Sequence, residues 1–413
     1  MKRYLLLLLL LGPEAGFATS LLIPMDDHQK NHLKAYGIAY WIMKKEMKVD
    51  WLLNYRGGSF MVQHSSAIET ECTIRGVSYE VIPDARANAI LSEIASPAVN
   101  MNVLPMEKVP RIAVYSPKNA FITDDTDAVI LVLDYAEIPY QIIYDKEVLE
   151  NELVKYDWLH LHHEDFTGQH GRFLRRESAI IESKVQETLA AQLGYNKVSE
   201  MKLEVAKHIK AFCAGGGYLF AMCSGAETFD IALAADGIDI SDAEYDGDEP
   251  DPAAQTKLDF SKTLAFENFT LEPGHSRKFS DINTGRTNFF EQNLGYFTLF
   301  DFSAKWDIVP SLLNQNHEHV IHEFIGQTTA FNKYLIKIQP TILGENRNGE
   351  NVRYLYGELG LGHWTFYGGH DPEGVPGRWR EATDLNLHPH SPGYRLILNN
   401  VLFPSAKKKK QKT

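Results

Sequence analysis

The chain has 413 residues, of which 44% are hydrophobic, and its formal net charge is −13. These values suit a globular protein of two or three domains and exclude a chain too polar to form a core. The acidic balance argues against nucleic acid as a partner, because surfaces that bind phosphates are basic.

The first 20 residues form a candidate signal peptide. Met1, Lys2 and Arg3 open the chain, a run of leucines covers 5–11, and small residues are frequent in 15–20. A basic start, a short apolar run and a small-residue exit are typical of a secretory signal, and the run is too short for the roughly 20 residues that span a bilayer. We expect cleavage near Ala18 or Ser20 and an exported product, periplasmic or secreted, without stable membrane insertion.

Residues 21–105 predict a small N-terminal α/β unit. Strand patterns at 21–25, 49–55 and 77–82 alternate with helical patterns at 32–48 and 84–94, which favours a parallel sheet. Arg56 follows the second strand and precedes Gly57 and Gly58. It could clamp a substrate carboxylate, or the two glycines could simply close a turn.

A second α/β unit is expected from 110–238 and 351–405, separated by an insertion at 239–350. Strand patterns at 111–116, 140–144 and 158–162 alternate with helical patterns at 127–136 and 170–212, and a last helix is expected at 394–403. Such a doubly wound sheet binds its ligand at the carboxyl ends of the strands. The insertion has aromatic and β-branched segments without helical periodicity, and we expect a strand-rich lobe there.

The most informative segment is 215–230. Three glycines precede an apolar run that ends at Cys223, followed by Ser224, Gly225 and a helical pattern. A strand, a tight turn with a nucleophile at its apex and a helix make up a nucleophile elbow. The positive end of that helix should lower the pKa of the thiol. The alternative is a buried cysteine at the end of a core strand.

A second segment, 362–373, supplies the partners that a nucleophilic cysteine needs. An aromatic strand pattern ends in two glycines and His370, with Asp371 and Glu373 just beyond. The imidazole would take the thiol proton and a carboxylate would orient the imidazole. Either acid could fill that role at this stage. The alternative is a histidine held in a turn by its neighbours.

Several further residues belong to the predicted rim of the site. Strand 158–162 leads to a sequence rich in His and acidic residues, for which we prefer substrate contact to a metal site, because spacing fixes no further ligand. Backbone N–H groups of 166–168 and of Ser224 are candidate oxyanion donors. The predicted substrate-binding residues are Ser224, Gly225, His163, Glu164, Phe166 and Arg56.

The chain also has two strongly charged segments and three cysteines. The acidic run at 239–251 favours a solvated loop; calcium is the alternative, but the spacing is not that of an EF-hand. The basic tail at 406–413 is expected to be solvated. Of the three cysteines, Cys72 and Cys213 could form a disulfide that leaves Cys223 reactive. No metal and no cofactor are expected.

From 110 to 405 the chain resembles the class I glutamine amidotransferase-like superfamily, which includes DJ-1/PfpI and ThuA-like proteins. That superfamily has a Gly-x-Cys-x-Gly elbow and a later His-Pro-Glu. Here Ala221 stands two residues before the cysteine, the second motif reads His370-Asp371-Pro372-Glu373, and the Gly-Gly-Pro oxyanion loop of glutaminases is not visible. The resemblance implies a flavodoxin-like, amidotransferase-like α/β fold with a large insertion.

The whole chain also resembles a group of secreted proteins from Bacteroidetes-type bacteria labelled asparagine synthetase B. The N-terminal cysteine and the ATP-binding Ser-Gly-Gly-x-Asp-Ser loop of such synthetases do not occur in this sequence. The expected activity is therefore hydrolysis of a small-molecule or peptide amide, or a related carbonyl, through a covalent intermediate on Cys223. The alternatives are a non-catalytic binding or scaffold module on the same fold and a ThuA-like protein acting on sugars.

Overall fold

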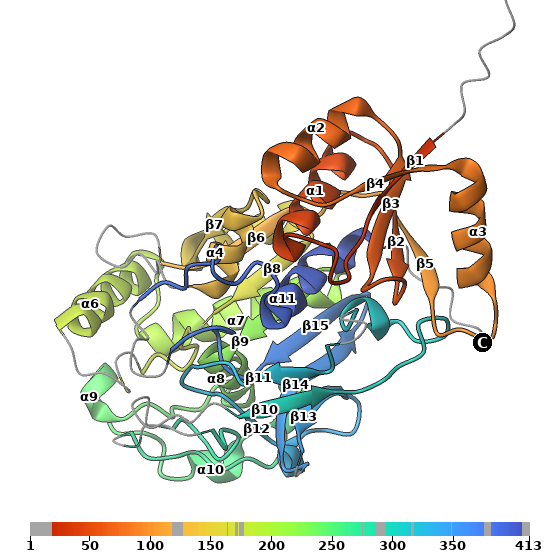
Figure 1. The fold of residues 1–413 in the computed structure, drawn as a ribbon. Coiled ribbons are helices and arrows are strands. Elements are labelled where there is room, and N and C mark those ends of the chain that lie inside the picture. Colours follow the sequence, from red (N-terminus) through yellow and green to blue (C-terminus); the bar gives the residue numbers. More distant parts are fainter. Residues whose placement is uncertain are drawn as a thin grey trace, which may run out of the picture.

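The computed structural model describes most of the chain, and Figure 1 shows its ribbon. The described residues are 19–117, 127–162, 164–169, 172, 177–274, 276, 278–285, 295–314, 318–347, 349–375 and 381–406. The predicted signal peptide up to residue 18, His163 and the tail from 407 on lie outside them.

The N-terminal unit contains a five-stranded sheet in the order β4-β1-β3-β2-β5. Every pairing in it is antiparallel, so the predicted parallel sheet is wrong. The physical reason is the short connection between the second and third strands, which cannot cross over and therefore forms a hairpin. The third strand also has no counterpart in the sequence prediction. The strands are β1 Thr19–Ile23, β2 Val49–Leu53, β3 Ser59–Gln63, β4 Glu80–Pro83 and β5 Asn102–Met106.

Helix α1 (His32–Lys44) connects the N-terminal unit to the rest of the molecule. Ten of its 13 residues are buried, as expected for a helix covered on all sides. One side packs with α2 (Ser66–Arg75) on the N-terminal sheet, and the other contacts α4 (Ala128–Tyr135) and α11 (Pro392–Leu402) of the second unit (Figure 1). A Cβ on Gly37 would lie 1.8 Å from the Ala136 carbonyl oxygen, so this contact requires glycine. Helix α3 (Asp84–Ala95) covers the opposite face of the small sheet.

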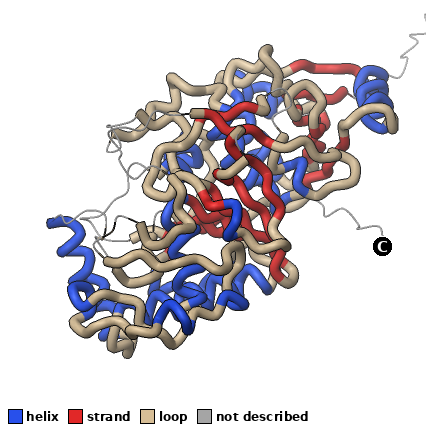
Figure 2. Tube along the Cα trace, turned by 90° about the horizontal axis from the view of Figure 1, so that it is seen from below, coloured by secondary structure: helices blue, strands red, loops and turns tan. Residues whose placement is uncertain are grey.

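The second unit is built on a ten-stranded sheet. Its parallel part has the order β15-β9-β8-β6-β7, and numbering these strands along the chain gives the order 2-1-3-4-5 from the β7 edge. Figure 2 shows strands running through the middle of the molecule, with helices to their sides. The parallel strands are β6 Ile112–Tyr115, β7 Gln141–Ile143, β8 Trp158–Leu161, β9 Tyr218–Met222 and β15 Gly362–Tyr367.

Both faces of the parallel strands are covered. Val114 of β6 faces the core shared with α1, α4 and α11, whereas its neighbour Tyr115 faces the core formed with α7 and α8. Alternation of this kind follows from the two-residue period of a strand. The second unit is therefore α/β, as expected. Its helices are α4 Ala128–Tyr135, α5 Asp145–Leu149, α6 Glu177–Gln192, α7 Val198–Ala214, α8 Cys223–Ala234 and α11 Pro392–Leu402.

Within the described residues, the insertion adds its strands to the large sheet. Strands β13, β10 and β11 extend the sheet outward from β14, each antiparallel to its neighbour, and β12 pairs separately with β14. The segment predicted as a separate strand-rich lobe is thus partly an extension of the core. The elements are β10 Tyr296–Leu299, β11 Val320–His322, β12 Phe331–Asn332, β13 Thr341–Asn346, β14 Asn351–Leu359, α9 Ala243–Asp246 and α10 Ala254–Lys257.

All three cysteines are free and buried. The sulfur of Cys213 lies 3.3 Å from the carbonyl oxygen of His363, while Cys72 belongs to the core around α1. The disulfide considered between them is therefore not formed. Within the part of the chain that the structure describes, no helix has the length and apolarity needed to cross a bilayer.

Candidate functional site

Cys223 lies at a tight turn between β9 and α8, where the sequence predicts it. Its φ is 53°, a left-handed conformation that costs a non-glycine residue about 1–3 kcal/mol. The helix can begin this close to β8 because residue 225 is glycine: a Cβ there would lie 2.2 Å from the His162 carbonyl oxygen. The geometry is that of a nucleophile elbow.

A short segment of the insertion, residues 325–328, covers the cysteine and is called the strap below. The backbone N–H groups of Gln327 and Thr328 donate to the Cys223 sulfur, at 3.1 and 3.4 Å. The Cys223 side chain, including its sulfur, is fully buried. Sequence reasoning missed these two donors, because the strap lies about a hundred residues from the elbow and contains no motif.

His370 approaches the same point from the end of β15. A Cβ built on Gly326 of the strap would lie 3.0 Å from His370 Nδ1 and 3.1 Å from Cys223 Sγ. His370 Nδ1 and Cys223 Sγ are therefore at most about twice 3.1 Å apart. Backbone bonds tie the strap to the His370 segment: Gly369 N–H donates to the Thr328 carbonyl at 2.7 Å and His370 N–H to the Ile325 carbonyl at 2.8 Å. The structure thus brings together the predicted nucleophile and base.

A buried carboxylate–histidine group lies beside His370. Asp127 Oδ2 is 3.1 Å from His162 Nδ1 and 3.3 Å from His160 Nε2, and the rings of His162 and His370 meet edge to face with centroids 4.8 Å apart. Burial opposes ionisation of Asp127, but the two histidines outweigh it and hold its pKa well below the usual range. Asp127 also caps α4 through the N–H groups of Val129 and Ile130. The sequence showed the histidines but gave no signal for Asp127.

The expected lowering of the thiol pKa is not found. Burial raises the pKa of Cys223 above its ordinary value, and the N–H groups of Thr328, Gln327 and Ser224, together with nearby His162, offset this only in part. The helix terminus is present, but it acts on a sulfur that is removed from water. Deprotonation of this thiol therefore requires a base close by.

The two acids considered as orienting groups have other partners. Asp371 accepts hydrogen bonds from Thr383 at 2.7 Å and from Tyr394 at 3.0 Å. Glu373 Oε2 lies 3.3 Å from His388 Nδ1. Neither contact directs a carboxylate at His370, and the ring that packs against His370 is that of His162.

Glu164 and Phe166, both predicted to bind substrate, are buried and have partners within the protein. Glu164 accepts from Tyr144 at 3.1 Å and lies 3.7 Å from the buried ammonium of Lys202. The Phe166 ring packs between Tyr115 and α8. Two of the three predicted oxyanion donors of this loop are also occupied, because Phe166 N–H donates to Thr228 and Thr167 N–H to Asp165. The Ser224 N–H keeps its predicted place at the sulfur.

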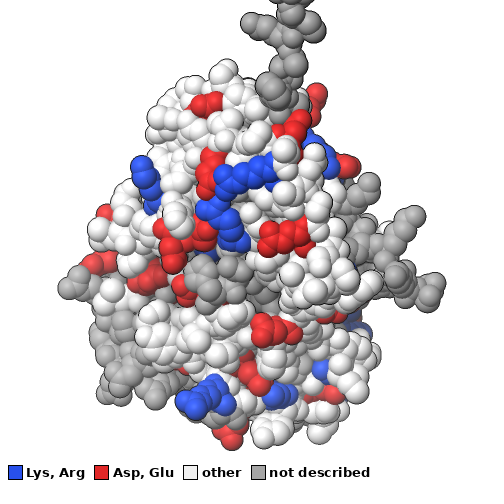
Figure 3. Space-filling view, turned by 45° about the vertical axis from the view of Figure 1, so that its right-hand side comes forward, with Lys and Arg blue, Asp and Glu red and all other residues white. Residues whose placement is uncertain are grey.

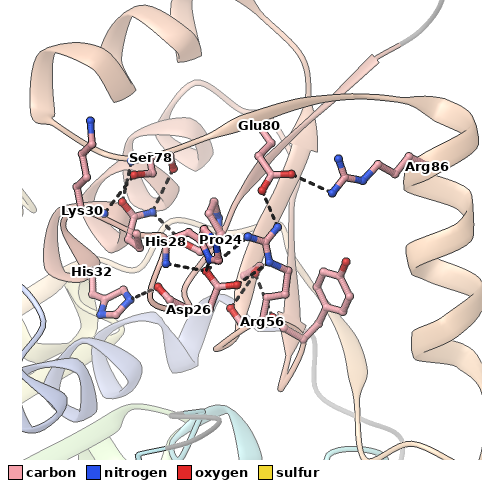
Figure 4. A network of polar contacts seen from close by, with 12 residues as sticks. Pro24, Asp26, His28, Lys30, His32, Arg56, Ser78, Glu80 and Arg86 are labelled. Atoms are coloured by element: carbon pink, nitrogen blue, oxygen red, sulfur yellow. Dashed lines mark hydrogen bonds and ion pairs between the residues drawn. The ribbon is translucent and has the colours of Figure 1, made fainter.

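Arg56 is bound by the protein's own carboxylates in the N-terminal unit. Its guanidinium lies 2.6 Å from Asp26 and 2.7 Å from Glu80, and Arg86 reaches the other oxygen of Glu80 at 3.1 Å (Figure 4). A substrate clamp would need this guanidinium to be available. The structure instead supports the alternative of a turn fixed by its surroundings.

Three aspartates of the acidic loop surround the ammonium group of Lys197. Asp239, Asp246 and Asp248 are the one set of three potential ligand residues that converges within the described ranges, but the ammonium of Lys197 lies 2.5 to 3.1 Å from all three. This pairing raises the pKa of Lys197 against the effect of burial. On the face shown in Figure 3, acidic and basic side chains are interspersed.

Glu227, one helical turn after the cysteine, is a further buried group that the sequence did not single out. Its carboxyl accepts from Thr328 Oγ at 2.6 Å and from Ser280 Oγ at 2.8 Å. Burial raises its pKa to about 7, despite these two hydrogen bonds and the charge of Arg172. Asp230 on the same helix accepts three backbone N–H groups from 264–266, and burial raises its pKa to about 6.

No protein-family model matches the chain, and no curated protein matches it. Among solved structures, cytoplasmic proteins STM3548 and STM1381 of Salmonella typhimurium each align with 11% identity and a TM-score of 0.38 over 72% of this chain, and over 100% and 99% of their own. Gan42B, a GH42 β-galactosidase from G. stearothermophilus, aligns over 64% of this chain and 28% of its own, with 11% identity and a TM-score of 0.30. Likenesses at this level carry no argument about function.

Replacing Gly326 with alanine should disrupt the site. The new methyl group would lie 3.0 to 3.1 Å from His370 Nδ1, Gly369 Cα and Cys223 Sγ, and we expect a loss of about 1–3 kcal/mol in the free energy of unfolding. Chemical denaturation measures the loss. Gly237→Ala is the matched control, because its φ is also positive but nothing lies within 4 Å of the added Cβ. Equal losses in the two variants would contradict the close packing around Gly326.

Glu227→Gln should make the protein's stability less dependent on pH. A carboxyl whose pKa rises from 4.5 to about 7 on folding binds its proton more tightly in the folded state, so stability falls as pH rises from about 5 to 8. The glutamine variant lacks this loss, on the order of 3 kcal/mol. Unfolding measured at pH 5 and pH 8 should show the variant gaining on the wild type at the higher pH. A constant difference would show that Glu227 does not titrate in this range.

Proposed function

We propose that the chain is a cysteine–histidine hydrolase acting on an amide or a related carbonyl. The observation that carries the proposal is the convergence of Cys223 Sγ and His370 Nδ1 on the strap at Gly326, with the cysteine held at a left-handed turn between a parallel strand and a helix. A nucleophile and a base on adjacent strand ends are the parts that acyl transfer requires.

The residues suggest the following sequence of steps. His370 takes the thiol proton as Cys223 attacks the substrate carbonyl, and the imidazolium then protonates the leaving amine. Water activated by His370 hydrolyses the thioester and restores the thiol. Asp127 holds His162 at 3.1 Å, and the His162 ring meets the His370 ring edge to face, so this pair would fix the orientation of the base. The N–H groups of Ser224 and the strap are the candidate donors for the oxyanion.

The strand order supports the finer assignment of the fold. An order of 2-1-3-4-5 among the parallel strands is that of flavodoxin-like sheets, whose ligands bind where the order reverses. Here that point lies between β6 and β8, whose ends lead to Asp127 and His162. This agrees with the resemblance to amidotransferase-like proteins.

A non-catalytic binding module is the second candidate. It is favoured by the complete burial of the Cys223 side chain and by its raised thiol pKa, which are both properties of an inert core cysteine. The two candidates differ in what they predict for the reactivity of the thiol.

Alkylation by iodoacetamide at pH 7, followed by peptide mapping, distinguishes the hydrolase from the binding module. For the enzyme we expect selective modification of Cys223 over Cys72 and Cys213, whose pKa values burial raises to about 12, and at least a tenfold slower reaction in His370→Ala. His319→Ala, a partly exposed histidine beside Asp301, is the control and should react as the wild type does.

Purified wild type screened against amides and short peptides should show hydrolysis that Cys223→Ser and His370→Ala reduce by about 10²-fold or more. A Cys223 thiol that iodoacetamide does not modify, or an alkylation rate that His370→Ala leaves unchanged, would support the binding module instead.

We also propose that the chain is exported. The supporting observation is the basic start and leucine run of residues 1–11, together with the start of β1 at Thr19. Cleavage after Ala18 leaves β1 complete, whereas cleavage after Ser20 removes its pairings with Gln63 and Pro83. Cell fractionation with N-terminal sequencing should recover a product that begins at Thr19. Recovery of an uncleaved chain from the cytoplasm would overturn the proposal.

A further inference from the structure

Glu227 contacts the strap from the same helix that carries the cysteine. It lies four residues after Cys223 on α8, and its Oε2 accepts the hydroxyl proton of Thr328 at 2.6 Å. The backbone N–H of that same Thr328 donates to the Cys223 sulfur. One residue of the strap is therefore bound twice by α8, once through its side chain and once through its amide.

The other end of the Glu227 carboxyl is also fixed. Its Oε1 accepts the hydroxyl proton of Ser280 at 2.8 Å, and Ser280 Oγ in turn accepts the N–H of Ile282. Glu227, Ser280 and Thr328 are all fully buried. A buried carboxyl with both oxygens engaged has little freedom to rotate, and it can hold a neighbouring loop at a defined position.

We propose that Glu227 is a positioning residue that holds the N–H groups of Gln327 and Thr328 against the Cys223 sulfur. On its other side the strap pairs with the 369–371 segment, and Asn283 donates to the Gln327 carbonyl. The Thr328 hydroxyl adds a side-chain hydrogen bond to α8 beside the two contacts at the sulfur. The N–H groups stabilise the thiolate more than the thiol, because hydrogen bonds to a charged acceptor are about twice as strong. The inference rests on the proposed role of Cys223 as the nucleophile.

Thr328 and Glu227 give two independent ways to break this link. Glu227→Ala removes the acceptor, and Thr328→Val removes the hydroxyl while keeping the branched shape. Glu227→Gln and Thr328→Ser preserve the hydrogen bond. Asp230→Asn is the matched control, since Asp230 is a second buried carboxylate on α8 that binds 264–266 instead of the strap.

The measurement is the rate of Cys223 alkylation from pH 6 to 10, followed by peptide mapping. The pH at the midpoint of this rate profile reports the pKa of the thiol, and the rate on its high-pH plateau reports access to the buried sulfur. A variant that is merely loosened changes the plateau rate and leaves the midpoint pH where it was. Loss of the two N–H donors moves the midpoint upward, so the thiolate fraction at pH 7 should fall about tenfold in Glu227→Ala and Thr328→Val.

The charged groups around the carboxyl affect the same titration. Arg172 favours the ionised form of Glu227, and His162 acts directly on the thiol. These groups are unchanged in all variants. Thr328→Ser leaves every charge in place, so its midpoint should stay at the wild-type pH. Glu227→Gln and Asp230→Asn each remove a carboxylate charge, which by itself lowers the pKa of a thiol, so neither should show the upward shift.

Unchanged midpoints in both Glu227→Ala and Thr328→Val would overturn the inference, and so would a wild-type Cys223 that resists alkylation throughout this pH range. The proposed function fails separately. If no amide is hydrolysed but the midpoint shifts as expected, Glu227 positions the strap on a thiol that has another use. Thermal melts of each variant show whether it is folded before alkylation is interpreted.

Discussion

The left-handed backbone at Cys223 is the constraint on which the site depends. A φ of 53° is unfavourable for cysteine, and it persists because the surroundings fix both sides of the turn. Before it, β9 is hydrogen-bonded to β8 and β15. After it, α8 approaches β8 so closely that only glycine fits at 225. The cysteine thereby lies at the carboxyl end of the sheet, where its sulfur meets the strap at the border of the core shared with α1, α4 and α11.

Burial and reactivity oppose each other at this sulfur. A fully buried thiol favours the neutral form, and the strap and His162 reduce that preference without reversing it. In the proposed hydrolase this arrangement becomes useful when a base takes the proton, because fixed N–H donors then need no reorganisation. Asp127 extends the arrangement by one layer: a buried carboxylate kept ionised by two histidines fixes His162, whose ring packs against His370.

The parts of the site that the sequence predicted are those with a local signature. The elbow at 218–225 and the histidine after the aromatic strand both follow from short patterns, and the structure places them together. The strap, Asp127 and Glu227 depend on contacts between segments far apart in the chain, which no local pattern encodes. The antiparallel N-terminal sheet was missed for a related reason, since alternating strands and helices do not fix strand direction when β3 is overlooked. Glu164, Phe166 and Arg56 have suitable chemistry, but each is held by partners that no local pattern shows, in the core for the first two and in a partly exposed ion-pair network for Arg56.

The insertion explains why this site differs from an open elbow. Its strands extend the main sheet through β10 and β13, so the strap that follows β11 is anchored to a rigid edge. From there the strap runs between Cys223 and the His370 segment and forms hydrogen bonds with both. In the proposed hydrolase a substrate carbonyl would have to displace or share these N–H groups to reach the sulfur. The sulfur is therefore positioned by the parallel strands, whereas its cover comes from the insertion.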